Sequence, residues 1–161
     1  MDEQGRLKVG DQAPEFCLKG AAGEQVCLSR YRGIAEVVVY FYPKDNSPAC
    51  TIEACSFRDD YERFREAGAE VIGISGDGPE SHARFASRHA LPFTLLTDPD
   101  GSTARRYGVA RTLGLIPGRA TFLIDRAGVV QHVFSSQLRP ARHVTEMLAV
   151  LERLRSSRQP G

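Results

Sequence analysis

Apolar residues along the chain are arranged in a way that predicts alternating strands and helices. Residues 37–41, Val-Val-Val-Tyr-Phe, are continuously apolar and mostly β-branched, which is typical of a central strand buried on both faces. A helical pattern follows, with Gly68 as its natural stop, and residues 71–74 repeat the buried-strand pattern. A strand, a helix and a strand in this order form a right-handed parallel unit, and function is expected at the carboxyl end of the first strand.

The rest of the pattern predicts a thioredoxin-like α/β fold. The further expected elements are an N-terminal hairpin (16–18 and 26–28), a helix (79–89), a short strand (93–96), a turn (97–101), a short helix ending near Gly108, a second hairpin (120–124 and 129–134), and a last amphipathic helix carrying Val144, Met147, Leu148, Leu151 and Leu154. Without the inserted α-β-α segment at about 79–117 and the N-terminal hairpin, the order is that of thioredoxin. We predict one domain over 1–161, with flexible ends at 1–9 and 156–161.

The segment after the first buried strand places a cysteine at the start of a helix. Ser47 is a favoured N-cap, Pro48 suits the first helical position, and Cys50 then falls in the first turn, where backbone N–H groups are unpaired. These donors and the helix dipole favour a thiolate, the nucleophilic form of cysteine. A hundredfold gain in thiolate over thiol requires about 2.7 kcal/mol, more than a helix terminus usually supplies. We therefore expect a nearby cation, an arginine in particular.

Composition and charge narrow the classes of function. The net charge of +1 gives no reason to expect nucleic acid or an anionic membrane as a partner. The sequence shows neither a run of 18 apolar residues nor a secretory leader, so we predict a cytoplasmic location. In that compartment the four cysteines point to catalytic, metal-binding or buried roles rather than a disulfide framework. The four histidines show no metal-ligand spacing and are expected at the surface or partly buried.

Two further pairs of residues are interpreted as structural rather than catalytic. The alternation of the first hairpin puts Cys17 and Cys27 on one face, away from the apolar residues. We interpret them as small side chains that fill a half-covered sheet face, with a cross-strand pair of thiols as the alternative. Asp98 and Asp100 are interpreted as turn residues.

The motif formed by Pro43, Ser47 and Cys50 resembles that of the peroxiredoxins, and specifically the Q-type branch also called bacterioferritin comigratory protein. The family pattern of Pro, three residues, Thr or Ser, two residues and Cys is met by Pro43, Ser47 and Cys50. A second cysteine five positions later, Cys55, is found in many Q-type members. The similarity covers about residues 10–154, including the segments 41–43, 57–59, 71–75 and 115–119 and the hairpin around Asp125.

This resemblance implies a role for each site residue. Cys50 would be the peroxidatic cysteine, Cys55 the resolving one, and Arg119 the cation that holds the thiolate. Ser47 would hydrogen-bond the thiolate or the peroxide, and Pro43 would shield the site from water. Ser47 replaces the commoner threonine and Ala49 a common glycine, departures that concern rate rather than reaction type. Two alternatives remain: Ser47 as an N-cap only, and Arg119 as an exposed hairpin residue.

The implied function is thiol-dependent reduction of hydrogen peroxide and alkyl hydroperoxides. A sulfenic acid on Cys50 would condense with Cys55 to a disulfide, which thioredoxin, or else glutaredoxin, would reduce. The resemblance implies no metal or organic cofactor and a monomer. The alternatives are a disulfide oxidoreductase that does not react with peroxide, which the missing Cys-x-x-Cys disfavours, and a redox sensor that uses the same two cysteines.

Overall fold

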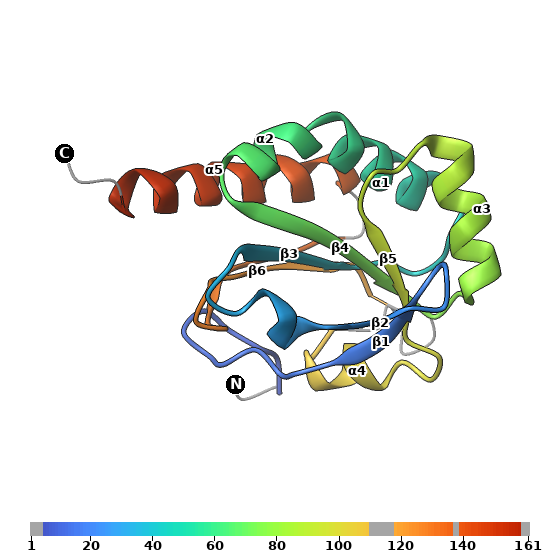
Figure 1. The fold of residues 1–161 in the computed structure, drawn as a ribbon, viewed down its shortest axis with the longest axis horizontal. Helices are drawn as coiled ribbons and strands as arrows, with labels where there is room; N and C mark the ends of the chain where they lie inside the picture. The colour runs from blue at the N-terminus through green and yellow to red at the C-terminus, as the bar shows by residue number, and fades with distance from the viewer. Residues whose placement is uncertain (1–4, 110–117, 137–138, 159–161) are drawn as a thin grey trace.

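The fold is built on one mixed sheet with helices on both faces (Figure 1). The computed structural model describes residues 5–109, 118–136 and 139–158. Within them seven strands pair in the order β2-β1-β5-β4-β3-β6-β7. The strands are β1 (Cys17–Gly20), β2 (Gln25–Cys27), β3 (Glu36–Phe41), β4 (Ala69–Ser75), β5 (Thr94–Thr97), β6 (Ala120–Ile124) and β7 (Val130–Ser135). The helices are a 3-10 turn (Leu28–Tyr31), α1 (Pro48–Asp59), α2 (Tyr61–Glu66), α3 (Pro79–His89), α4 (Ser102–Arg106) and α5 (Pro140–Arg158).

The strand pairing confirms the predicted thioredoxin-like arrangement. β3 pairs parallel with β4, and β4 pairs parallel with β5. β6 runs antiparallel to β3 and continues into the predicted hairpin with β7. The N-terminal hairpin of β1 and β2 extends the other edge of the sheet through β5. The inserted segment supplies α3, β5 and α4, as predicted.

The strand β3 is buried on both faces because helices and loops cover the sheet on each side. Val38 and Tyr40 pack into a cluster with α1, α2 and α5. Val39 and Phe41 face the opposite cluster, which includes Tyr107 just after α4. A strand in this position has no solvent-facing side, which explains its unbroken apolar sequence.

Several boundaries differ from the expectation. The helical stretch before Gly68 breaks at Asp60 into α1 and α2, and the break leaves Tyr61 and Phe64 buried in the core. The last helix, α5, extends to residue 158, into the range 156–161 for which a flexible end is predicted. Within the range 1–9, Leu7 is buried and its N–H donates to the Tyr107 carbonyl at 3.4 Å, and the flexibility of the two ends remains a prediction.

The structure also corrects the interpretation of Cys17 and Cys27. Strand register sets the two residues directly opposite each other, and their sulfur atoms form a disulfide. The predicted face was right, since Phe16 and Val26 lie in the core while Cys17 is exposed. Interpreting the pair as unbonded space-fillers was wrong, because opposite positions in an antiparallel pair bring side chains close enough to bond.

Two of the four histidines were also misplaced by sequence. His82 and His143 have 0% exposure and are hydrogen-bonded, whereas His89 and His132 are partly buried as expected. Asp98 is confirmed as a turn residue, since its carboxylate accepts from the N–H groups of Thr103 and Ala104 at the start of α4. In the described part of the chain, no helix combines the length and apolar character that a membrane span needs.

Candidate active site

Cys50 lies in the first turn of α1, directly beyond the carboxyl end of the central strand. Ser47 has extended φ and ψ at the N-cap position, Pro48 opens the helix, and the Cys50 side chain is only 1% exposed. The first N–H groups of a helix have no partner within it, so they present partial positive charge around this turn. The predicted helix start is therefore confirmed.

Arg119 is the cation expected beside Cys50, in addition to the helix terminus. Its Nη2 donates to Cys50 Sγ at 3.2 Å, and the residue is only 3% exposed. Strand pairing explains this placement, because Ala120 at the start of β6 lies opposite Phe41 at the end of β3. The alternative of an exposed hairpin residue is excluded. Residues 115–117 of the family-like segment before Arg119 lie outside the described part of the chain.

Glu53 shares the same guanidinium, a contact that sequence reasoning missed. Arg119 Nη1 donates to Glu53 Oε1 at 2.5 Å, so the two terminal nitrogens of one guanidinium contact the carboxyl group and the thiol. Burial raises the pKa of Glu53 to about 8, although Arg119 opposes this change. A carboxyl group that keeps its proton at neutral pH leaves the positive charge of Arg119 available to the sulfur. The available signal was the spacing of Cys50 and Glu53, which puts both on one helix face.

His143 of α5 lies behind this group as a neutral imidazole. Burial, with a smaller contribution from Arg119, lowers the pKa of His143 to about 4. Its Nε2 lies 2.9 Å from the Ser136 carbonyl, which can only accept, so Nε2 carries the proton. Nδ1 then accepts from the Thr121 hydroxyl at 2.7 Å. The nearest carboxyl oxygen, Glu53 Oε2, is 3.5 Å from Nδ1. An uncharged neighbour adds no second cation to compete with Arg119.

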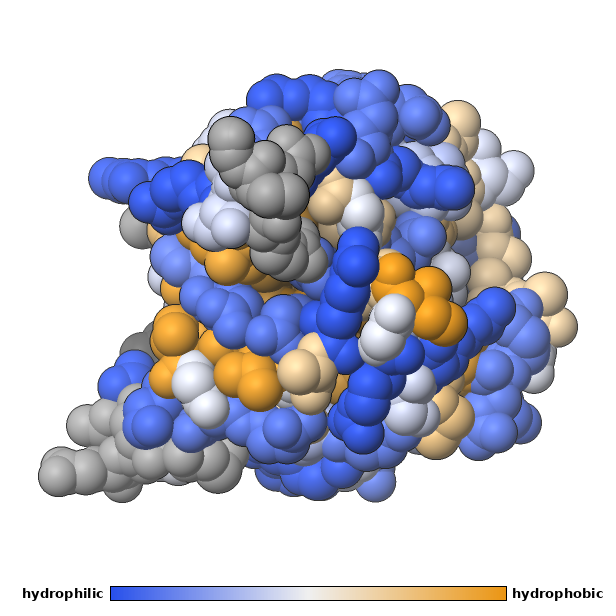
Figure 2. All heavy atoms as spheres, turned by 60° about the vertical axis from the view of Figure 1, so that its left-hand side comes forward, coloured by the Kyte–Doolittle hydropathy of each residue, from blue (hydrophilic) through white to orange (hydrophobic). Residues whose placement is uncertain are grey.

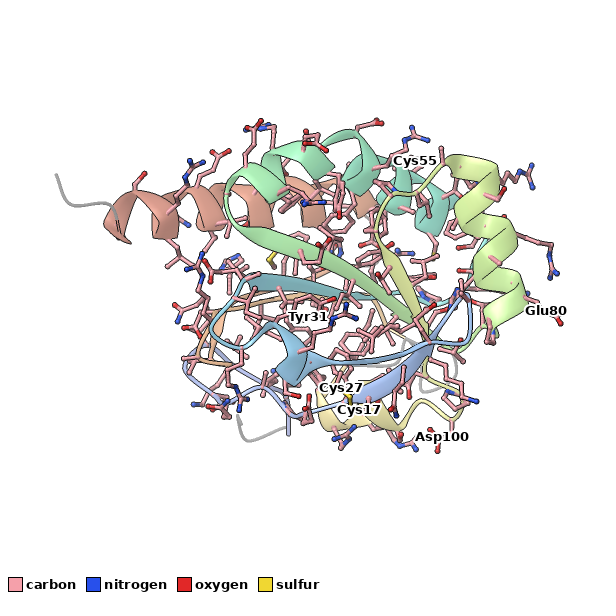
Figure 3. The ribbon with its side chains drawn as sticks, viewed as in Figure 1. Cys17, Cys27, Tyr31, Cys55, Glu80 and Asp100 are labelled. Carbon is pink, nitrogen blue, oxygen red and sulfur yellow. A yellow bond between two sulfur atoms is a disulfide. The ribbon has the colours of Figure 1, made fainter. Side chains whose placement is uncertain are left out.

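Cys55 is the other free cysteine of the described residues and lies on the same helix. It is partly exposed, whereas Cys50 is buried, and α1 is continuous between them. Figure 3 shows Cys55 on the side of the sheet that α1 covers, away from Cys17 and Cys27. Five helical positions correspond to about 7.5 Å along the axis and about 140° of rotation. The two sulfur atoms therefore cannot bond while this part of α1 stays helical.

Ser47 and Pro43 belong to the loop that leads into α1. The Ser47 hydroxyl donates to the Lys44 carbonyl at 3.1 Å and makes no cap bond. Pro43 is half-buried and, together with Phe41 and Gly118, lines a cavity of about 320 Å³ at the carboxyl ends of the strands. Sequence reasoning placed both residues in the correct loop, and their chemical roles remain predictions.

A second polar cluster, not found from sequence, fastens this loop to α3. Asp45 Oδ2 accepts from the Ser81 hydroxyl at 2.8 Å and lies 2.8 Å from His82 Nδ1, and Asp45 Oδ1 accepts from the Tyr42 hydroxyl at 2.6 Å. The other ring nitrogen of His82 lies 3.1 Å from the Leu96 carbonyl. Burial opposes ionisation of Asp45, but the bonds from His82 and Tyr42 outweigh it and lower its pKa. The cluster thus holds a charged carboxylate beneath the loop of Ser47.

We predict that His82→Phe destabilises the protein by about 2–3 kcal/mol, because the buried Asp45 carboxylate loses one of its three side-chain partners. Since the pKa of Asp45 is lowered by folding, this contribution is present above the unfolded value near 3.9 and disappears in stronger acid. Chemical denaturation at pH 7 and pH 3 measures both effects. The control is His89→Gln on the same helix. Equal stability of the two variants at pH 7 would contradict the role of the cluster.

We also predict that Glu53→Gln alters the pH dependence of peroxide attack. In the wild type, Glu53 ionises as the pH rises through about 8 and then competes for Arg119. The glutamine keeps a hydrogen-bond acceptor without the charge. The variant should exceed the wild-type rate constant above pH 8, on the order of tenfold, and match it near pH 6. Stopped-flow rates from pH 6 to 9.5 test this, and parallel profiles for the two proteins would contradict it.

The fold and the site are those of a thiol peroxidase. Comparisons with known proteins agree with this class. The chain belongs to the AhpC/TSA family, whose profile matches residues 9–133. It is 49% identical over 151 residues to the chloroplastic peroxiredoxin Q of Sedum lineare, covering 93% of this chain and 81% of that protein. It is 47% identical over 148 residues to the chloroplastic peroxiredoxin Q of Arabidopsis thaliana, covering 91% and 68%. The chain is thus a peroxiredoxin of the Q type.

Solved structures extend the match to the whole fold. Peroxidoxin BcpB from Mycobacterium tuberculosis superposes with a TM-score of 0.86 at 36% identity, covering 92% of this chain and 99% of that one. The bacterioferritin comigratory protein of Xanthomonas campestris gives 0.82 at 29% identity, covering 92% and 98%. The chain is therefore an enzyme, a peroxidase of the oxidoreductase class. Because the plant relatives are named chloroplastic, the predicted cytoplasmic location gains no support from them.

Proposed function

We propose that Cys50 is the peroxidatic cysteine of this peroxidase. The observation that carries the proposal is the Arg119 guanidinium, with Nη2 3.2 Å from Sγ at the first turn of α1. The thiolate attacks one peroxide oxygen, the O–O bond breaks, and a sulfenic acid forms on Cys50. The other oxygen leaves with a proton as water or as an alcohol. Positive charge fixed at the site stabilises the negative charge that develops on this oxygen.

The proposed substrates are hydrogen peroxide and alkyl hydroperoxides. The bacterioferritin comigratory protein of Xanthomonas campestris, which is described with alkyl peroxide reduction activity, supports the second class. Ser47 would hydrogen-bond the peroxide after its hydroxyl turns away from the Lys44 carbonyl, to which it now donates. Pro43, half-buried beside the strand ends, would keep water from the sulfur.

Cys55 is proposed as the resolving cysteine. Its thiol would attack the Cys50 sulfenic acid, form the S–S bond and release water. The intervening helix must open for this step, since an intact α1 separates the two side chains. Opening releases Ile52, which is already 52% exposed and so contributes little packing. The resulting disulfide would be reduced by an external dithiol protein, for which we propose thioredoxin, with glutaredoxin as the alternative.

Oxidation is therefore predicted to raise amide exchange across the first turns of α1. Residues 48–56 should lose protection in the disulfide form and regain it on reduction, because the disulfide and the helix exclude each other. Hydrogen exchange with mass spectrometry on both redox states measures this, and α5 in the same protein serves as the internal control. Equal protection of residues 48–56 in the two states would show that Cys50 has a partner other than Cys55.

The function is tested by steady-state peroxide consumption with thioredoxin or glutaredoxin as the electron donor. A peroxidase consumes many equivalents of peroxide per chain, whereas a redox sensor stops near one and a thiol-exchange protein consumes none. We expect many turnovers with thioredoxin and fewer with glutaredoxin. Consumption that stops after one equivalent with either donor would favour the sensor.

We further propose that residues 1–161 form one cytoplasmic, monomeric domain that works without a metal or organic cofactor. Large exposed hydrophobic residues of the described chain are scattered, at Val9, Ile34 and Ile52. Figure 2 shows one face on which hydrophobic residues form small separate groups among polar ones. A stable subunit interface usually needs a broader apolar patch. The near-neutral charge likewise supports a protein that binds neither nucleic acid nor membranes.

A further inference from the structure

The disulfide between Cys17 and Cys27 lies on the outer side of the N-terminal hairpin. The two residues face each other across β1 and β2, and the next pair, Leu18 and Val26, points the opposite way into or against the core. Cys17 is exposed and Cys27 half-buried, so the S–S bond is accessible from solvent. Figure 3 shows the pair beside the outer strands of the sheet.

This pair is structurally separate from the peroxide site. Cys50 and Cys55 are both carried by α1, which packs on the face of the sheet occupied by Val38 and Tyr40. The hairpin contributes its apolar residues to the other cluster, with Val39 and Phe41. Cys17 and Cys27 lie in strands, and Cys27 only precedes the short 3-10 turn at residues 28–31, whereas Cys50 lies within the first turn of the 12-residue helix α1. The pair therefore lacks the environment that activates a peroxidatic thiol.

An exposed disulfide in a peroxidase is open to thiol–disulfide exchange. Accessible disulfides tend to be the labile or regulatory ones, whereas buried structural disulfides resist reduction. We propose that Cys17 and Cys27 form a second redox centre that exchanges with dithiols in solution and takes no part in peroxide turnover. This proposal rests on the described hairpin and does not depend on the role assigned to Cys50.

The proposed thiol–disulfide exchange involves the hairpin disulfide and one external dithiol. A thiolate of the dithiol attacks one hairpin sulfur, the Cys17–Cys27 bond breaks, and a mixed disulfide forms. The second thiol of the reductant then displaces the hairpin sulfur. The hairpin gains two electrons and two protons, and the dithiol becomes a disulfide. In the reverse reaction, the disulfide form of such a dithiol oxidises the Cys17 and Cys27 thiols.

The oxidation state of this centre controls how firmly the sheet edge is held. β2 has three residues and is an edge strand, paired on one side only, with β1. Short edge strands with few ladder bonds open easily. The covalent link at Cys27 joins the end of β2 to β1 just before the 3-10 turn at residues 28–31. Reduction should therefore loosen residues 25–31 while the central strands remain protected.

The test uses the full chain with both α1 cysteines replaced, Cys50→Ser and Cys55→Ser, so that only the hairpin sulfurs react. The protein is equilibrated natively in buffers of reduced and oxidised dithiothreitol and then labelled with a polyethylene glycol maleimide. We expect no label under oxidising conditions, two labels under reducing conditions, and full reversal on reoxidation. A matched protein that also carries Cys17→Ser and Cys27→Ser should take no label under either condition.

Hydrogen exchange on the same samples provides an independent readout. Residues 25–31 should exchange at least several-fold faster in the reduced form, with β3 and β4 unchanged. Labelling that appears only after denaturation would show a purely structural disulfide and overturn the proposal. Two labels even under oxidising conditions would show that the bond does not form and would overturn it as well. Neither result involves peroxide, so failure here is separate from failure of the peroxidase assignment.

Discussion

Replacing Cys50 by serine is expected to reduce peroxide consumption to the level of buffer alone. Cys50 lies in the first turn of α1, and an Arg119 nitrogen lies 3.2 Å from its sulfur. Cys17 and Cys27 are bonded to each other in a disulfide between strands. Cys55 is a free thiol, but it lies five positions further along α1, beyond the unpaired N–H groups of the first turn. A serine hydroxyl keeps the size of the side chain and lacks a nucleophilic anion at neutral pH.

The measurement is the steady-state loss of peroxide with an excess of thioredoxin and its reductase. The double replacement Cys17→Ser with Cys27→Ser is the matched control and should retain turnover within about twofold. Thermal unfolding of both variants establishes that their folds are intact. If the Cys50 variant kept a tenth of the wild-type turnover, the nucleophile would be a different cysteine.

Replacing Arg119 by leucine should slow peroxide attack by roughly 10²–10³-fold, the usual cost of removing one donor from a charge-stabilising site. The guanidinium donates to Cys50 Sγ and is buried, so water cannot take its place. Two effects should add. The thiolate loses its nearest cation, and the transition state loses a donor to the departing oxygen.

The two effects are separated by measuring alkylation of Cys50 against pH alongside the rate constant for peroxide. We expect the alkylation midpoint to move upward and the rate, corrected for thiolate content, to fall as well. Arg119→Lys is the matched control, because it keeps the charge and loses the fork that joins Cys50 to Glu53. It should recover the midpoint more fully than the rate. An unchanged midpoint and rate in the leucine variant would remove Arg119 from the mechanism.

The sequence was informative where local patterns determine the structure. The unbroken apolar run of β3 reflects burial on two faces, and Ser47 and Pro48 mark a helix start through their own backbone preferences. The placement of Cys50 follows directly from these two features. The role of Arg119 came from the family resemblance, because its burial depends on the pairing of Ala120 with Phe41, which no local pattern encodes.

The features that sequence reasoning missed depend on contacts between distant parts of the chain. Glu53 resembles any helical glutamate until Arg119 reaches it from β6, and burial then raises its pKa. His82 and Asp45 meet only because α3 packs beside the loop after β3. The Cys17–Cys27 bond depends on strand register, where a shift of one residue would separate the two sulfurs. The spacing of Cys50 and Glu53 and the alternation of the first hairpin are partial signals in the sequence, but neither specifies the contact itself.

The most direct test of the central claim locates the sulfenic acid. In a Cys55→Ser variant the oxidised Cys50 cannot be resolved within the chain, so one equivalent of peroxide in the presence of dimedone should trap the sulfenic acid as a thioether. Tandem mass spectrometry then identifies the modified residue. We predict one dimedone adduct per chain, on Cys50. An adduct on Cys17 or Cys27, or an unmodified Cys50 after the peroxide has been consumed, would contradict the account.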